Sequence, residues 1–84
     1  MENTNRPLYE IAHDVRKNWK NIYFGAKPYL EAMQELDKIT DMFYMDTAKS
    51  VVLYFISNAG TWKGDDAKRI KNELRKMVGI KPSK

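Results

Sequence analysis

The chain has 84 residues, no cysteine and a formal net charge of +4. This length supports one modest hydrophobic core, and the lack of cysteine excludes disulfide bonds and thiolate metal sites. We therefore expect one domain over residues 1–84, with flexible ends at 1–6 and 80–84. The N-terminal sequence lacks the plan of a signal peptide, and no apolar run approaches the roughly 20 residues that span a bilayer. These features predict an intracellular protein without membrane contact.

The first predicted helix begins near Leu8 and ends before Gly25. Pro7 fits its first turn, where an N–H would have no partner, and Thr4 or Asn5 can cap it. Apolar residues recur at helical spacing and define one face. They are Leu8, Ile11, Ala12, Val15, Trp19, Ile22 and Tyr23.

The second predicted helix opens at Pro28 and stops near Thr40. Its apolar stripe consists of Tyr29, Ala32, Met33 and Leu36. The stretch that follows, "DMFYMD" at residues 41–46, places four apolar residues between two acids. Periodicity does not decide between a turn of helix and an extended connector, so we treat it as a linker.

The third predicted helix starts at a cap, Asp46 or Thr47, and stops at Gly60 in the left-handed conformation. Residues 51–56 are rich in β-branched and aromatic side chains, so a strand is the rival interpretation. A lone strand needs a pairing partner, and no other segment offers one. We therefore predict a central helix in which Phe55 is buried.

The fourth predicted helix opens with Asp65 and Asp66, whose charges suit the positive end of the helix dipole, and stops at Gly79. Its narrow apolar face consists of Ala67, Ile70, Leu74, Met77 and Val78. Opposite this face lies a basic band of Lys68, Arg69, Lys71, Arg75 and Lys76. Four helices with short connections predict an all-α fold, a single small four-helix bundle.

The residue types and their spacing give little reason to predict catalysis or metal binding. The one histidine, His13, is on the polar side of the first helix, and Glu10 with His13 makes half of a di-iron motif that needs a second copy. No glycine-rich phosphate-binding motif occurs. We predict that the protein is not an enzyme and has no cofactor or metal site.

Charge is concentrated in the second half of the chain. Residues 1–47 carry six Lys/Arg and eight Asp/Glu, whereas residues 48–84 carry nine and three. The basic helix suggests nucleic-acid binding, but its first turn holds Asp65 and Asp66, which would repel phosphates at a recognition tip. Backbone contact along the side of the helix, without sequence specificity, remains open.

A protein-binding module is the remaining class. The segment 42–45 with Leu53, Tyr54 and Trp62 exceeds what so small a bundle readily hides, so we expect at least one exposed cluster. Trp62 is either a plug at the end of the core or an aromatic anchor beside it. The predicted partner-binding residues are Trp62, Lys63, Lys68, Lys71 and Arg75.

Two stretches, "NWKNIYFGAKPYLEAM" and "AKSVVLYFISNAGTWKGDDAKRIKNELRKM", resemble small helical proteins encoded by phages and prophages of Gram-positive bacteria. The resemblance implies an accessory protein in the bacterial cytoplasm that binds and inhibits a host enzyme or defence complex, as anti-CRISPR proteins do. The basic charge departs from the acidic character of DNA mimics, which favours steric blocking or contact with a guide RNA.

We therefore predict a non-enzymatic protein whose partner is a host protein or nucleoprotein complex. The alternative is a nucleic-acid partner held through phosphates by the basic fourth helix. A homo-oligomer that uses the third helix is compatible with both.

Overall fold

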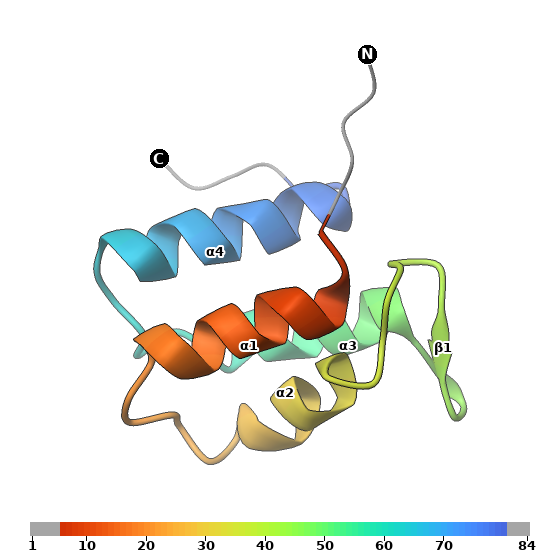
Figure 1. Cartoon of the computed structure of the whole chain (residues 1–84), viewed down its shortest axis with the longest axis horizontal. Helices are drawn as coiled ribbons and strands as arrows, with labels where there is room; N and C mark the ends of the chain where they lie inside the picture. The colour runs from red at the N-terminus through yellow and green to blue at the C-terminus, as the bar shows by residue number, and fades with distance from the viewer. Residues whose placement is uncertain (1–5, 81–84) are drawn as a thin grey trace.

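The computed structural model describes residues 6–80 and is mostly α-helical. Successive helices run in alternating directions, and α1 and α4 pack side by side (Figure 1). The all-helical prediction therefore holds for most of the chain, but a small two-stranded sheet interrupts the predicted pure bundle. The elements are α1 (Leu8–Asn18), α2 (Lys27–Met33), β1 (Met42–Phe43), β2 (Asp46–Thr47), α3 (Ala48–Ser57) and α4 (Asp65–Met77).

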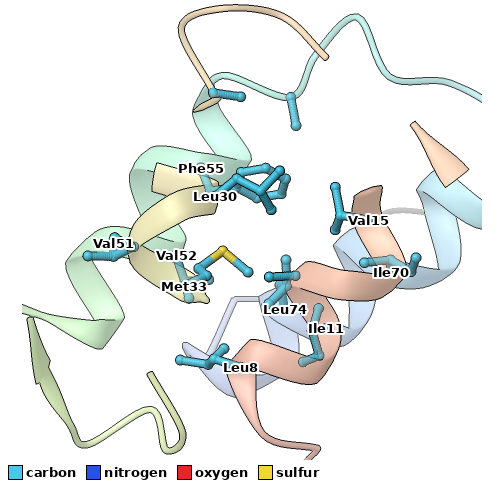
Figure 2. Close-up of a cluster of buried hydrophobic side chains, with 14 of the residues drawn as sticks. Leu8, Ile11, Val15, Leu30, Met33, Val51, Val52, Phe55, Ile70 and Leu74 are labelled. Carbon is cyan, nitrogen blue, oxygen red and sulfur yellow. The ribbon is translucent and has the colours of Figure 1, made fainter. Parts of the chain in front are cut away.

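All four helices contribute to one hydrophobic core (Figure 2). Phe55 of α3 is fully buried in this core, as predicted. Within residues 6–80 the buried side chains are all apolar, so polar chemistry is confined to the surface. None of the helices in this range is long and apolar enough to cross a membrane.

The start of α1 is capped by another part of the chain. The N–H groups of Leu8 and Tyr9 donate to the carbonyls of Asp37 (2.8 Å) and Leu36 (2.9 Å), which follow α2. These bonds satisfy donors that a helix N-terminus leaves unpaired. Pro7 immediately precedes the helix. The predicted side-chain caps, Thr4 and Asn5, lie outside the described residues.

The end of α1 comes earlier than predicted. Nδ2 of Asn18 donates to the carbonyl (2.8 Å) and Oδ1 (2.9 Å) of Asp14, which closes the last turn. Trp19 then adopts an extended conformation and turns its ring into the core. Residues 19–26 are therefore a connection, and the helix predicted to reach Tyr23 stops at Asn18.

The second helix is also shorter than predicted, ending at Met33 and not near Thr40. Oδ2 of Asp41 accepts hydrogen bonds from the N–H groups of Asp37 (3.2 Å) and Lys38 (3.0 Å). Such local side-chain bonds compete with helix formation. The turn that they hold leads into the sheet.

The segment 41–46 is extended and not helical. Met42 pairs with Thr47 and Phe43 with Asp46, so two residues, Tyr44 and Met45, form the turn. Two-residue hairpin turns favour Asn-Gly or Asp-Gly because they need positive φ angles. Tyr44 supplies the positive φ here (55°). The sequence therefore carried no hairpin signal.

The predicted helix over residues 51–56 is confirmed within α3, and Thr47 is its cap. Oγ1 of Thr47 accepts a hydrogen bond from the N–H of Ser50 at 3.1 Å. The stop predicted at Gly60 is wrong, because α3 ends at Ser57 and the positive-φ glycines of the described chain are Gly64 and Gly79.

Both ends of α4 use glycine. Gly64 (φ 108°) precedes it, and Gly79 (φ 83°) stops it as predicted. The N–H of Ile80 donates to the carbonyl of Arg75 at 2.8 Å, which completes a Schellman motif. Most of the ends predicted to be flexible lie outside the described residues. The two described members, Arg6 and Ile80, are each held by hydrogen bonds.

Candidate functional site

The structure brings all five predicted partner-binding residues to one hollow of about 210 Å³. Two come from the connection before α4, and three follow one another along a single side of the helix. Ala67 and Gly64 complete the lining. We call this hollow the basic pocket, and its predicted members are Trp62, Lys63, Lys68, Lys71 and Arg75.

Trp62 forms a buried wall of the basic pocket. Its side chain is 4% exposed, and its ring stacks on Trp19 with 5.2 Å between centroids and an angle of 6°. Trp19 in turn meets the ring of Phe55 edge-on at 6.2 Å. Of the two alternatives left by the sequence, the structure selects the plug, and an exposed aromatic anchor is excluded at this position.

Lys71 is tied to the connection between α3 and α4. Its Nζ donates to the carbonyls of Trp62 (2.7 Å) and Ala59 (3.0 Å). Partial burial lowers the pKa of Lys71, and the positive charges of Arg75 and Lys63 lower it further. Lys71 is therefore partly buried and hydrogen-bonded, and it is not a freely exposed charge like Lys63. Lys71 holds the shape of the basic pocket.

The other cations of the basic pocket are open to a partner. Lys63 and Lys68 are exposed, and Arg75 is half-buried and donates to Oδ1 of Asn72 at 2.9 Å. Across residues 6–80, no carboxylate lies within ion-pair distance of any cation in this pocket. Uncompensated charge lining a hollow concentrates positive potential there. The site can therefore attract an anionic group.

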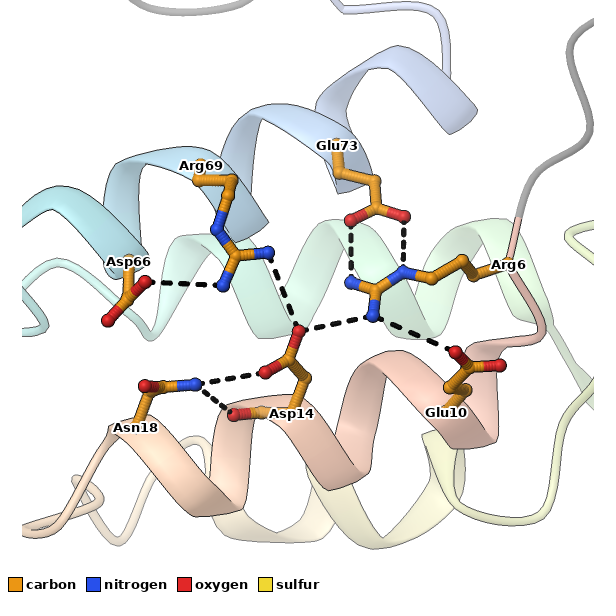
Figure 3. A network of polar contacts seen from close by, with 7 residues as sticks. All are labelled: Arg6, Glu10, Asp14, Asn18, Asp66, Arg69 and Glu73. Carbon is orange, nitrogen blue, oxygen red and sulfur yellow. Dashed lines mark hydrogen bonds and ion pairs between the residues drawn. The ribbon is translucent and has the colours of Figure 1, made fainter.

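Arg69 does not belong to the basic pocket, although the sequence placed it in the same band. Its guanidinium contacts Asp14 (3.5 Å) and Asp66 (3.2 Å) on the side of α4 that faces α1. Arg6 lies in the same network and makes two hydrogen bonds to Glu73, at 2.7 and 2.9 Å (Figure 3). We call Arg6, Asp14, Asp66, Arg69 and Glu73 the paired cluster.

The paired cluster alters the titration of its members. Partial burial alone would raise the pKa of Asp14, but the hydrogen bond and charge of Arg6, together with Arg69, lower it overall. The pKa of Arg6 is raised, chiefly by its hydrogen bonds to Glu73. Positive charge on this side of α4 is thus neutralised within the molecule.

A second hollow adjoins the basic pocket and was not predicted. It measures about 520 Å³ and shares Trp62 and Lys63 with the basic pocket. The sequence assigned its residues 18–21 to a continuous first helix, which concealed their position in a connection. Its remaining lining residues are Asn18, Trp19, Lys20, Asn21 and Thr61.

The predicted exposed apolar cluster is present in the hairpin, where Tyr44 is 86% and Met45 91% exposed. A second exposed group was missed. Phe24 is 75% and Tyr23 42% exposed, and their rings lie 4.9 Å apart in the connection between α1 and α2. The sequence placed Tyr23 on the apolar face of a helix. Gly25, which follows this pair, was the available sign of a break.

His13 is exposed, and the described residues contain no group of three or more His, Asp or Glu placed to hold a metal ion. Comparisons of the chain with protein-family models, curated proteins and solved structures give no match. The resemblance to phage proteins therefore stays a prediction, and function must be argued from the geometry.

Proposed function

We propose that the protein is a small non-enzymatic binding module that docks through the basic pocket onto an anionic surface of a host protein or nucleoprotein complex. The observation that supports this proposal is the contrast in pairing along α4. Arg69 is compensated by carboxylates, whereas the cations of the basic pocket contact none among the described residues. Such charge speeds association with an anionic partner and selects against cationic ones.

The resemblance to phage proteins supplies the proposed biological setting. In that setting the protein inhibits a defence or nucleic-acid-processing complex of the bacterial host by occupying an anionic surface. The net charge of +4 suits a basic ligand of such a surface better than a mimic of DNA.

The test is affinity capture from a lysate of a Gram-positive bacterium. The bait is the wild-type protein or a variant that combines Lys63→Glu with Lys68→Glu. A matched control combines Lys38→Glu with Lys49→Glu, which changes the net charge equally. These exposed lysines lie near the hairpin, at the opposite end of α3 from the pocket.

We expect the pocket variant to lose a partner that the wild type and the control retain. Equal capture by all three baits would contradict the proposal. Nuclease treatment before capture separates a partner held by protein contacts from one held through nucleic acid.

A further inference from the structure

We infer that the anionic surface recognised by this end of the molecule is single-stranded nucleic acid. The inference rests on the proposed function and names the class of partner for the same site. It depends on three features that lie together: the basic pocket, the adjoining second hollow, and the exposed ring pair of Tyr23 and Phe24. Each feature alone suits several partners, but their combination matches one.

The basic pocket and the second hollow are continuous. Because the two hollows share Trp62 and Lys63, a ligand in one leads directly into the other. The path begins at Arg75 and Lys68 on α4 and ends at Lys20 in the connection after α1. The exposed side chains of Asn21 and Thr61 lie along its second half. Proteins bind a phosphate backbone through cations and neutral hydrogen-bonding side chains of this kind.

The aromatic pair lies beside this path. Tyr23 and Phe24 follow Asn21 after one intervening residue, Ile22, and the connection that carries them lies at the same end of the molecule as the start of α4 (Figure 1). A β-carbon at Gly25 would lie 2.6 Å from Cε2 of Tyr23 and 3.0 Å from Oδ1 of Asn58. The connection therefore packs against the end of α3, next to the carbonyl of Ala59 that holds Lys71.

The positions of the buried and exposed rings discriminate between classes of partner. An acidic protein surface is best held when a central aromatic anchor is available, and Trp62 is buried in that position. The exposed rings lie instead beyond the cations, where unpaired bases could stack on them. A duplex hides its base faces and is stiff over about 150 base pairs, so it cannot follow a path around the connection. A flexible single strand can.

The test measures fluorescence anisotropy with a labelled oligonucleotide of about 12 nucleotides, which falls in the range of known single-strand site sizes of about 4–16. Parallel titrations use a duplex of the same sequence and a poly-glutamate peptide. We expect the single strand to bind more tightly than both. Its affinity should fall with salt, with a slope of about 0.7 for each cation contact.

Two pairs of variants locate the contacts. Lys68→Ala should reduce the salt slope by about 0.7, while its control, Lys49→Ala, should leave it unchanged. Phe24→Ala should weaken single-strand binding about 5- to 140-fold through lost stacking. Its control, Tyr44→Ala, removes an exposed ring at the far hairpin and should have no effect.

Equal affinity for single strand and duplex, or unchanged binding by Phe24→Ala, would overturn the inference. Tighter binding of poly-glutamate that still depends on Lys68 would also overturn it, in favour of an acidic protein partner, and would leave the proposed function standing. If neither the single strand nor poly-glutamate binds, the inference is overturned, whereas the proposed function is decided separately by the capture experiment.

Discussion

The two sides of α4 carry the same kind of residue in opposite circumstances. Toward α1, Arg69 and Glu73 join Arg6 and Asp14 in the paired cluster, where each charge meets its opposite (Figure 3). Toward the connection with α3, the basic pocket contains four cations. Lys71 donates to backbone carbonyls, Arg75 donates to an amide oxygen, and the other two cations are exposed to solvent. One helix therefore separates positive charge that is paired within the fold from positive charge that has no carboxylate partner among the described residues.

This difference has an energetic basis. Partly buried ion pairs with hydrogen bonds in good geometry contribute more than exposed ones, which give about 0–1 kcal/mol. Like charges gathered around a hollow oppose one another, so an unoccupied basic pocket contributes repulsion. Anion binding relieves that repulsion, and the free energy gained favours the complex.

The largest effect should come from the core beneath both sides. Phe55→Ala removes a fully buried ring that supports Trp19, which in turn stacks on Trp62. We expect a loss of about 3–5 kcal/mol in the free energy of unfolding, measured by urea denaturation. Because Trp62 forms a wall of the pocket, any folded fraction should also bind its partner less well. A loss below about 1 kcal/mol would contradict this packing.

The fold could be predicted wherever one element's own pattern decided it. The apolar spacing of α4 is a local feature that was read correctly, and the cap of α3, Thr47, was one of the two residues offered by the sequence. Errors arose where distant groups intervene. The capping of Leu8 by Asp37 depends on a contact across the fold, and the hairpin at Tyr44 lacks the residues that usually mark such a turn.

The basic pocket was predictable because Lys68, Lys71 and Arg75 share one side of a regular helix. The ion pair between Arg69 and Asp14 was not predictable, because Asp14 is on another helix. Nor did spacing reveal that Lys71 reaches back to the carbonyl of Ala59. Sequence thus identified which charges lie together, while the structure determined which of them are already engaged.

The next largest effect should come from the paired cluster. Arg6→Ala removes both hydrogen bonds from Arg6 to Glu73 and one of the hydrogen bonds that Asp14 accepts. These side chains are partly exposed, so we expect a loss of about 1–2 kcal/mol, between the values for surface and buried pairs. A double-mutant cycle that combines Arg6→Ala with Glu73→Ala should give a coupling energy that shows a stabilising interaction between the two side chains. Additive effects would show that the pair is not formed in solution.

A similar or somewhat smaller loss should follow from Lys71→Met. This variant keeps much of the aliphatic stem but leaves the carbonyl of Trp62 without the donor seen here. Relief of repulsion from Arg75 and Lys63 offsets part of that loss, so we expect about 1 kcal/mol. Thermal unfolding monitored by circular dichroism measures it. An increase in stability would mean that repulsion outweighs the two hydrogen bonds.

The two sides should also respond to opposite ends of the pH scale. The folded-state pKa of Asp14 lies below its ordinary 3.8. The stability that Asp14 contributes is therefore present above pH 3.8 and is lost as pH falls through the folded-state pKa. The pKa of Lys71 is lowered from 10.5, so the unfolded chain binds this proton more tightly and stability rises as pH increases toward 10.5. Arg6→Ala should remove most of the acid effect, and Lys71→Met the alkaline one, in denaturation curves measured across pH.

The smallest effect on stability should come from the open cations. Lys63→Glu together with Lys68→Glu changes exposed side chains without carboxylate partners in the described chain, so the free energy of unfolding should change by less than about 0.5 kcal/mol. Loss of the charge of Lys63 should nevertheless raise the pKa of Lys71, because that charge helps to lower it. NMR titration of the Lys71 side chain measures this shift. If the pKa of Lys71 stays unchanged while partner binding is lost, the open cations act on the partner without sharing a field with Lys71. The basic pocket would then be a set of independent charges.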